Sequence, residues 1–108
     1  MVYRNGRRYE SSLVTAFVLP NKLPYNRFGI TASRKAIGNA VQRNRARRLL
    51  REAFRLRESL LNELNEKYDW VFNAKRKLPA QKVDAAFEEF EKVVSKVARE
   101  EGKIHTFG

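Results

Sequence analysis

The sequence contains no cysteine and a single histidine, His105, near its C-terminus. Without cysteine the chain has no disulfide, thiol nucleophile or cysteine-based zinc site, and one histidine does not make a histidine-rich metal centre. No run of about 18 apolar residues is present, so no membrane-spanning helix is predicted. The basic N-terminal residues are not followed by an apolar stretch of about 7–15 residues, so we expect no secretory signal. Membrane, disulfide and thiolate chemistry are therefore excluded.

Acidic residues are also scarce: 12 Asp and Glu stand against 23 Lys and Arg in 108 residues, for a net charge of +11. Nine of the cations fall in residues 34–57, where Glu52 is the one acid, so these 24 residues carry +8. The length suits one domain, expected over residues 1–108, and 43% hydrophobic residues indicate a globular chain. Charge clustered in this way predicts a polyanionic partner.

Three segments are predicted to form strands. Leu13–Leu19 is short, rich in β-branched and aromatic residues, and is stopped by Pro20. Arg27–Ser33 alternates between apolar and polar residues, and we expect it to form an antiparallel hairpin with the first strand. Tyr68–Ala74 carries large side chains in succession, which predicts a central strand.

Helical periodicity dominates the remainder. Apolar residues recur at three- and four-residue steps over residues 39–64, with Asn39 as N-cap and a break expected near Glu58. A second helix is predicted from Pro79 to about residue 99, followed by a frayed tail over 102–108. The order β-β-α-β-α predicts an α+β fold with the sheet on one side and the helices on the other.

The helix predicted over residues 39–64 contains the main cluster of basic residues. All seven cations between residues 43 and 57 are arginine, and those at 43, 47, 51 and 55 fall on one helical face. Like charges at this spacing destabilise an isolated helix, so an anionic partner is needed to offset them. Guanidinium groups bind phosphate with two hydrogen bonds and stack on bases, which favours nucleic acid.

Two other interpretations of this helix stay open at this point. Most charge runs are solvated surfaces, although such a surface needs counter-charges that are missing here. A basic amphipathic helix can also lie on anionic lipid, although the apolar stripe of this one is needed for the core. RNA is favoured over DNA because aromatic residues near the sheet could stack on unpaired bases, namely Tyr3, Phe17, Phe28, Tyr68 and Trp70. Phe28 and Trp70 fit a core better, whereas both interpretations stay open for Tyr3 and Phe17.

The stretch from Gly38 to Arg55, centred on Arg43-Asn44-Arg45, closely resembles the signature of the bacterial ribonuclease P protein subunit. Asn26–Lys35 and Tyr68–Lys75 look like the strands on either side of it, and Val2–Gly6 is similar to the family's first helix-to-strand junction. The resemblance implies an α/β sandwich of order α-β-β-β-α-β-α, with a mixed sheet of about four strands, two to three helices and a left-handed crossover around the basic helix. It also implies a helix before Val2, which this chain would hold only in shortened form.

The same resemblance implies a cytoplasmic protein subunit of a ribonucleoprotein that removes the 5′ leader from precursor tRNA. The partners are then the catalytic RNA, which holds Mg²⁺, and the precursor tRNA, with no DNA or membrane. The residues matched to RNA contact are Arg34, Lys35, Arg43, Asn44, Arg45, Arg47, Arg48 and Arg51. Those matched to the leader cleft are Tyr3, Phe17, Thr31 and Ser33. No metal ligand is assigned.

Two other functions compete with this one. A ribosomal or RNA-chaperone-like protein without a processing role shares a small α/β layout and a basic helix, and fold alone does not decide function. An autonomous nuclease is disfavoured, because the sequence offers no pair of histidines and no carboxylate cluster for two metal ions. We therefore expect no catalytic residue in the chain itself.

Overall fold

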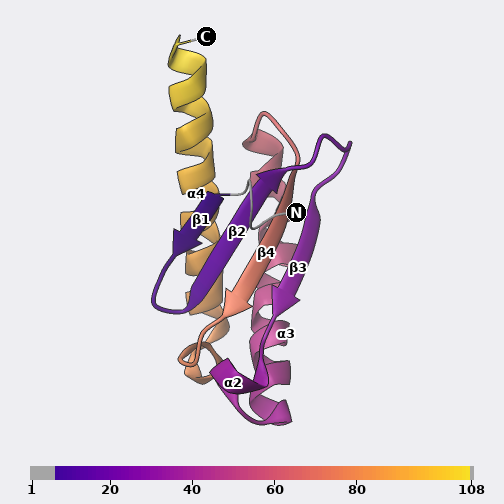
Figure 1. The fold of residues 1–108 in the computed structure, drawn as a ribbon, viewed down its shortest axis with the longest axis vertical. Coiled ribbons are helices and arrows are strands. Elements are labelled where there is room, and N and C mark those ends of the chain that lie inside the picture. Colours follow the sequence, from indigo (N-terminus) through magenta and orange to yellow (C-terminus); the bar gives the residue numbers. More distant parts are fainter. Residues whose placement is uncertain (1–6, 108) are drawn as a thin grey trace.

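A computed structural model describes the backbone of residues 7–107 and the side chains of residues 7–101. Tyr3 and the predicted junction over residues 2–6 lie outside the described residues. Along the chain the elements are β1 (Arg7–Glu10), β2 (Val14–Pro20), β3 (Arg27–Thr31), α2 (Arg34–Ile37), α3 (Ala40–Arg57), the 3₁₀ helix η1 (Glu58–Glu63), β4 (Tyr68–Ala74), the 3₁₀ turn η2 (Leu78–Ala80) and α4 (Val83–Phe107) (Figure 1).

The strands form one mixed sheet in the order β1-β2-β4-β3. Strand β2 is antiparallel to both β1 and β4, and β3 is parallel to β4. The predicted hairpin between the first two strands of the sequence analysis is therefore wrong, because β4 lies between them. The loop over 21–26 has only to cross two strand spacings, about 10 Å, which six residues reach easily. The prediction that residues 68–74 form a central strand is confirmed.

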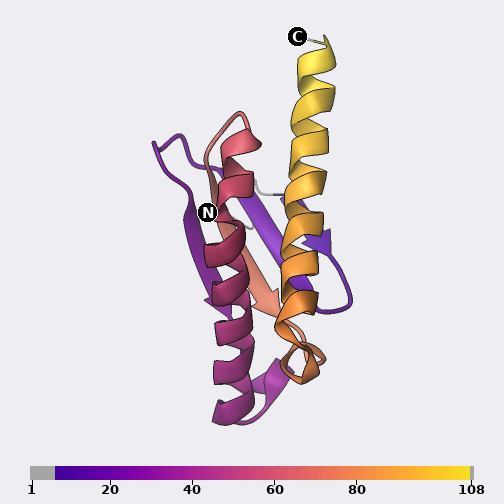
Figure 2. The same ribbon diagram turned by 180° about the vertical axis from the view of Figure 1, so that it is seen from behind.

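The connection from β3 to β4 runs through α2, α3 and η1. In Figure 2, β3 and β4 both run downward, α3 returns upward in front of the sheet, and β4 lies to the right of β3. This geometry is a left-handed crossover, the uncommon hand for two parallel strands. It confirms the handedness that the family resemblance implied.

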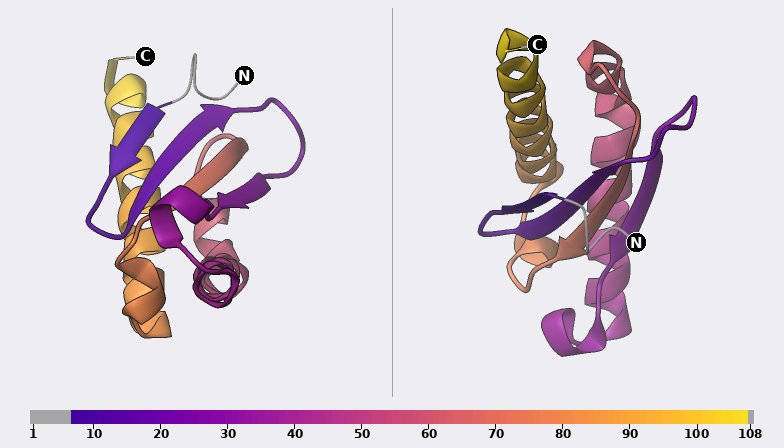
Figure 3. Two further views of the ribbon diagram at one scale, coloured as in Figure 1. Left: turned by 60° about the horizontal axis from the view of Figure 1, so that its bottom comes forward. Right: turned by 45° about the horizontal axis from the view of Figure 1, so that its top comes forward.

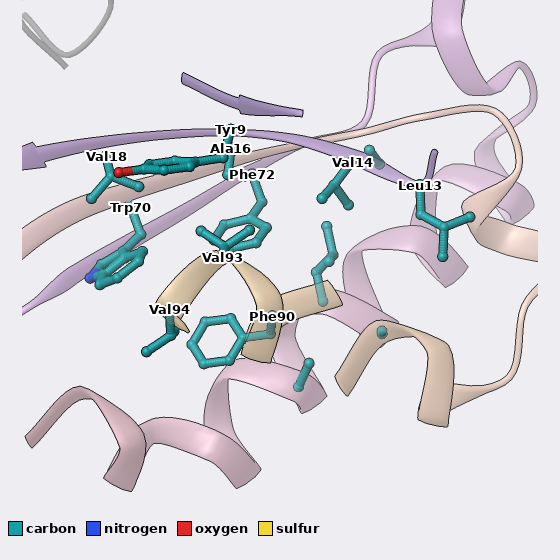
Figure 4. Close-up of a cluster of buried hydrophobic side chains, with 14 of the residues drawn as sticks. Tyr9, Leu13, Val14, Ala16, Val18, Trp70, Phe72, Phe90, Val93 and Val94 are labelled. Carbon is teal, nitrogen blue, oxygen red and sulfur yellow. The ribbon is translucent and has the colours of Figure 1, made fainter. Parts of the chain in front are cut away.

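Helices α3 and α4 cover the same face of the sheet (Figures 2 and 3). Side chains alternate along β4, so that Tyr68, Trp70 and Phe72 point into the core while the residues between them point to the other face. Phe90 of α4 packs on this layer, with its ring centroid 5.7 Å from that of Phe72 and 5.9 Å from that of Phe54 of α3 (Figure 4). Each such ring buries enough apolar surface to dominate the packing energy.

The helix boundaries follow local capping. The Asn39 side chain accepts a 2.9 Å hydrogen bond from the backbone N–H of Gln42, which fixes the start of α3 as the sequence predicted. The expected break near Glu58 is confirmed, since η1 begins there. The second long helix differs from prediction at both ends: Pro79 belongs to η2, α4 begins at Val83, and α4 continues to Phe107 where a frayed tail was expected. None of the described helices is long and apolar enough to cross a membrane.

A buried polar cluster ties β4 to α4. The Tyr68 hydroxyl donates to the Glu101 carboxylate, which also accepts a 2.8 Å bond from the backbone N–H of Asn65. Burial and the bond to Glu101 raise the pKa of Tyr68 above its ordinary value of 10, and burial, more than the neighbouring Glu100, raises the pKa of Tyr9 to about 12. Both tyrosines are therefore kept neutral in the folded state.

We predict that stability falls at alkaline pH and that Tyr68→Phe weakens this fall. Because the folded-state pKa is raised, the contribution of Tyr68 is complete below pH 10 and is lost as pH rises from 10 through the raised value. At neutral pH, Tyr68→Phe should cost about 1–3 kcal/mol, since Glu101 loses a buried donor. Denaturant unfolding between neutral pH and pH 11 measures both effects, with the exposed Tyr25→Phe as control. Equal stability of the two variants at neutral pH would contradict this account.

Candidate nucleic-acid interface

The outer face of α3 holds cations that no described residue neutralises. The helix packs on the sheet and α4 through four buried residues, Ala46, Leu49, Leu50 and Ala53. Arg48 and Arg51 lie away from this side and are exposed, and neither forms a hydrogen bond or ion pair with the described residues. Their guanidinium groups are therefore available to an external anion.

Helix α2 adds two more cations at the start of the basic helix. It begins at Ser33, whose hydroxyl oxygen accepts a 3.0 Å hydrogen bond from the backbone N–H of Ala36. Arg34 and Lys35 are exposed on its single turn and have no ion-pair partner among residues 7–101. Sequence periodicity predicted no helix between the strand ending at Ser33 and the helix beginning at Asn39, whereas a capped turn of helix holds both cations beside the first turns of α3 (Figure 3).

The Arg43-Asn44-Arg45 motif is only partly directed outward. The Arg43 guanidinium is half-buried and donates a 2.7 Å hydrogen bond to the Gly38 carbonyl, closing the turn between α2 and α3. Gly38 has a φ of +102°, a conformation that favours glycine at this turn. Asn44 is exposed and accepts a 3.2 Å bond from Arg47, so these two side chains form one polar pair on the surface.

Arg45 turns to the opposite flank of α3. Its Nε donates to the Pro79 carbonyl, and its NH2 group donates a 2.7 Å bond to the Gln81 carbonyl. These contacts hold η2 and the start of α4 against α3. Residue spacing gave no sign of this contact, because the acceptors are backbone carbonyls that any sequence provides.

The C-terminal cations of α3 are neutralised within the protein. Arg55 pairs with Glu52 on the same helix. Arg57 forms a 2.7 Å ion pair with Glu91 of α4 and lies 4.5 Å from the centre of the Phe87 ring. Among the described cations of α2 and α3, those that are exposed and form neither a hydrogen bond nor an ion pair therefore lie in α2 and the middle of α3, whereas the sequence predicted a stripe at 43, 47, 51 and 55.

The sheet face opposite the helices forms a second surface. The register places Phe17, Val71 and Gly29 in one row across β2, β4 and β3. In the next row, Thr31 is exposed and its hydroxyl donates to the Asn73 side chain. The alternation of β4, with Tyr68, Trp70 and Phe72 buried, is the sequence signal that identifies Val71 and Asn73 as members of this face.

A hollow of about 260 Å³ lies at one end of this face, lined by Arg27, Phe28, Gly29, Asp69, Trp70 and Val71. A Cβ on Gly29 would meet only the Trp70 carbonyl oxygen, 4.0 Å away, so the floor of the hollow is open. Arg27 grips Asp69 with two hydrogen bonds, of 2.7 Å from Nε and 2.6 Å from NH2, and this grip lowers the pKa of Asp69. The wall of the hollow is thus a fixed, nearly neutral ion pair.

Of the four residues predicted to line a cleft, the structure places Phe17 and Thr31 on the open sheet face. Ser33 instead caps α2, and Tyr3 lies outside the described residues. The aromatic rings of Tyr68 and Trp70 are buried in the core and are not available for stacking on a ligand. Among the described side chains, no group of three or more His, Asp or Glu residues is placed to hold a metal ion.

Comparison with known proteins shows which family the chain belongs to. The family model described as Ribonuclease P matches residues 1–98. The chain belongs to the ribonuclease P protein family. A ribonuclease P protein component from Fusobacterium nucleatum is 38% identical over 96 residues, covering 89% of this chain and 83% of the relative. Another from Clostridioides difficile is 34% identical over 98 residues, covering 91% and 80%.

Solved structures of the family have the same fold. The RNase P protein of Staphylococcus aureus superposes with a TM-score of 0.73 at 26% identity, covering 90% of this chain and 87% of that chain. The RNase P protein of Thermotoga maritima has a TM-score of 0.75 over 88% of this chain and 86% of that chain, and at 22% identity it supports the fold alone. The predicted α+β class and family resemblance are both confirmed.

Proposed function

We propose that this chain is the protein subunit of a cytoplasmic ribonuclease P and binds the catalytic RNA through the exposed cations of α2 and α3. Family membership supports the assignment, and the uncompensated charge supports the surface. The observation that carries it is that Arg34, Lys35, Arg48 and Arg51 are exposed and unpaired within the described residues, while Arg55 and Arg57 further along α3 are neutralised.

Binding by these cations follows from their chemistry. Each guanidinium offers a planar pair of donors that fits a phosphate, and each phosphate neutralised releases condensed counterions from the RNA. Because α2 and the start of α3 are fixed by the Asn39 cap and the Arg43–Gly38 bond, their cations are held before RNA arrives. Less side-chain and backbone ordering is then required on binding.

We propose that the open sheet face holds the single-stranded 5′ leader of precursor tRNA. Phe17 and Val71 offer a flat apolar surface on which a base can rest, and Thr31 and Asn73 offer hydrogen-bonding groups in the adjoining row. The hollow above Gly29 leaves room for one nucleotide. This division assigns structured RNA to the helices and unpaired RNA to the sheet.

In this proposal the protein positions RNA and does not cut it. Hydrolysis would belong to the RNA subunit, whose bound Mg²⁺ would supply the metal-ion chemistry. The residues of this chain contribute phosphate neutralisation on α2 and α3 and placement of the leader on the sheet face. Both effects raise the local concentration of the substrate near the catalytic RNA.

Reconstitution with a bacterial ribonuclease P RNA tests the proposal. At low Mg²⁺, the protein should accelerate removal of the leader from precursor tRNA by at least tenfold, because its cations replace part of the charge screening otherwise supplied by Mg²⁺. The protein without the RNA should give no cleavage. A ribosomal or chaperone-like protein would bind the RNA without accelerating leader removal, and that outcome would overturn the proposal.

A further inference from the structure

A second set of unpaired cations lies outside the basic helix, in the connection between β4 and α4. Arg76, Lys77 and Lys82 are exposed, and none of them forms an ion pair with a described residue. Lys75 differs, because its Nζ donates to Glu10 at 2.9 Å and to the Ser11 carbonyl at 2.6 Å. Asp84, the first acid after these cations along the chain, is exposed and also forms no ion pair with a described residue, so it does not neutralise them.

This connection is held in one conformation. Its turn is closed by a 3.0 Å bond from the Leu78 N–H to the Lys75 carbonyl and another from the Gln81 N–H to the Leu78 carbonyl. Leu78 is fully buried and anchors the turn in the core. The Gln81 side chain donates a 3.2 Å bond to the Lys77 carbonyl, which fixes the backbone that carries that cation.

Arg45 joins this turn to α3. One edge of its guanidinium, formed by Nε and NH2, is occupied by the carbonyls of Pro79 and Gln81. That edge is one of the two through which a guanidinium can form two parallel hydrogen bonds to a phosphate. Arg45 therefore differs from Arg48 one turn further along, whose side chain is exposed and forms no hydrogen bond or ion pair with a described residue.

The result is a broader cationic end of the molecule. Figures 1 and 2 show the β4–α4 connection, α2 and the start of α3 gathered at the end opposite the C-terminus. Arg76 and Lys77 extend the charge of α2 and α3 onto the flank where α4 begins. Two adjacent cations without counter-charges on a fixed turn suit the evenly spaced phosphates of an RNA strand.

We propose that Arg76 and Lys77 form a second phosphate-binding site for RNA and that Arg45 is the positioning residue that holds it in place. The proposal rests on the RNA-binding function proposed above and adds a site to it. The ligand is the phosphate backbone of the same RNA that contacts α3. Arg45 contributes through the turn it holds, and its own charge is secondary.

A double-mutant cycle on binding to ribonuclease P RNA tests both parts. The variant Arg76→Ala/Lys77→Ala should bind about tenfold more weakly and reduce the slope of log affinity against log salt by roughly 1.5, as expected for two lost phosphate contacts. The matched control is Lys96→Ala/Arg99→Ala, which removes the same charge from exposed positions on the outer side of α4. This control should change affinity by less than about twofold. An equal loss in both variants would refute the site.

The role of Arg45 is tested in the unchanged protein and in the Arg76→Ala/Lys77→Ala variant. Arg45→Ala should weaken binding in the otherwise unchanged protein but have less than about a twofold effect once Arg76 and Lys77 are alanine, because coupled residues are not additive. Arg45→Lys, which keeps the charge but not the fork, should behave like Arg45→Ala. It should also speed trypsin cleavage at residues 76–77, because the turn that carries them is no longer held. Full binding by Arg45→Lys, or additive losses in the cycle, would overturn the positioning role.

Arg51→Ala separates failure of this inference from failure of the proposed function. If Arg51→Ala weakens binding while Arg76→Ala/Lys77→Ala does not, the α3 surface stands and the second site is wrong. If none of these variants weakens binding, RNA binding through this end of the molecule is itself refuted. Thermal unfolding of each variant shows that the protein is folded under the binding conditions.

Discussion

Replacing Arg48 and Arg51 together by alanine is expected to lower the affinity for ribonuclease P RNA by about 100-fold. Both side chains are exposed and form no bond with the part of the chain that the structure describes, so the fold should stay intact. A hydrogen bond to a charged group contributes about 1.5–3 kcal/mol, and losing two such contacts with partial compensation by water gives about 2.7 kcal/mol, or 100-fold. Equilibrium binding at fixed salt measures the effect.

The control for this prediction lies on the same helix. Arg55 and Arg57 are paired with Glu52 and Glu91, so their charge is already offset inside the protein. Arg55→Ala/Arg57→Ala removes the same net charge and should weaken RNA binding less than about fivefold, since the removed cations are partly engaged elsewhere. Similar losses in the two double variants would show that net charge, and not the open part of α3, governs binding.

Phe90→Ala is expected to have the largest effect on stability. The ring is 1% exposed and contacts the rings of Phe28, Phe54, Trp70 and Phe72, which join the sheet to both long helices. Truncating a buried phenylalanine costs about 3–5 kcal/mol, a large share of the 5–15 kcal/mol that stabilises a typical domain. The melting temperature should fall by roughly 15–25 °C, as measured by calorimetry.

Phe90→Ala should lose RNA binding only at temperatures at which the variant is unfolded. Phe90 lies in the core and has no exposed surface for RNA, so the variant should bind normally wherever it is folded. Val41, which is 74% exposed on α3, provides the control, because Val41→Ala should change stability by no more than about 0.5 kcal/mol. A cost below about 1 kcal/mol for Phe90→Ala would contradict the packing described here.

Much of the fold could be predicted from periodicity. The succession of large side chains in Tyr68–Ala74 predicted the central strand with its observed bounds, and the Asn39 cap predicted the start of α3. Strand order could not be read in the same way. Both β2 and β3 carry one buried face, and nothing in their own residues shows that β4 will lie between them. That order depends on the left-handed crossover, which came from the family resemblance.

The candidate site was predicted in its location but not in its detail. Clustered charge identified the basic helix, and the structure shows which of its cations are free. Arg43 and Arg45 donate to backbone carbonyls, and Ser33 caps a helix that the sequence did not predict. Such contacts depend on where loops fold back, and residue type alone does not reveal them. The sequence did not identify Val71 and Asn73 as residues of the open sheet face, because only the large side chains of their strand were used to predict its place in the sheet.

The salt dependence of binding to ribonuclease P RNA tests the central claim most directly, namely that the open cations of α2 and α3 neutralise RNA phosphates. The logarithm of the affinity should fall linearly with the logarithm of the salt concentration, with a slope of about 0.7–0.9 for each phosphate neutralised. Arg48→Ala/Arg51→Ala should reduce this slope by roughly 1.5, whereas Arg55→Ala/Arg57→Ala should leave it nearly unchanged. A flat profile for the unmodified protein, or the same slope for the unmodified protein and Arg48→Ala/Arg51→Ala, would contradict the account.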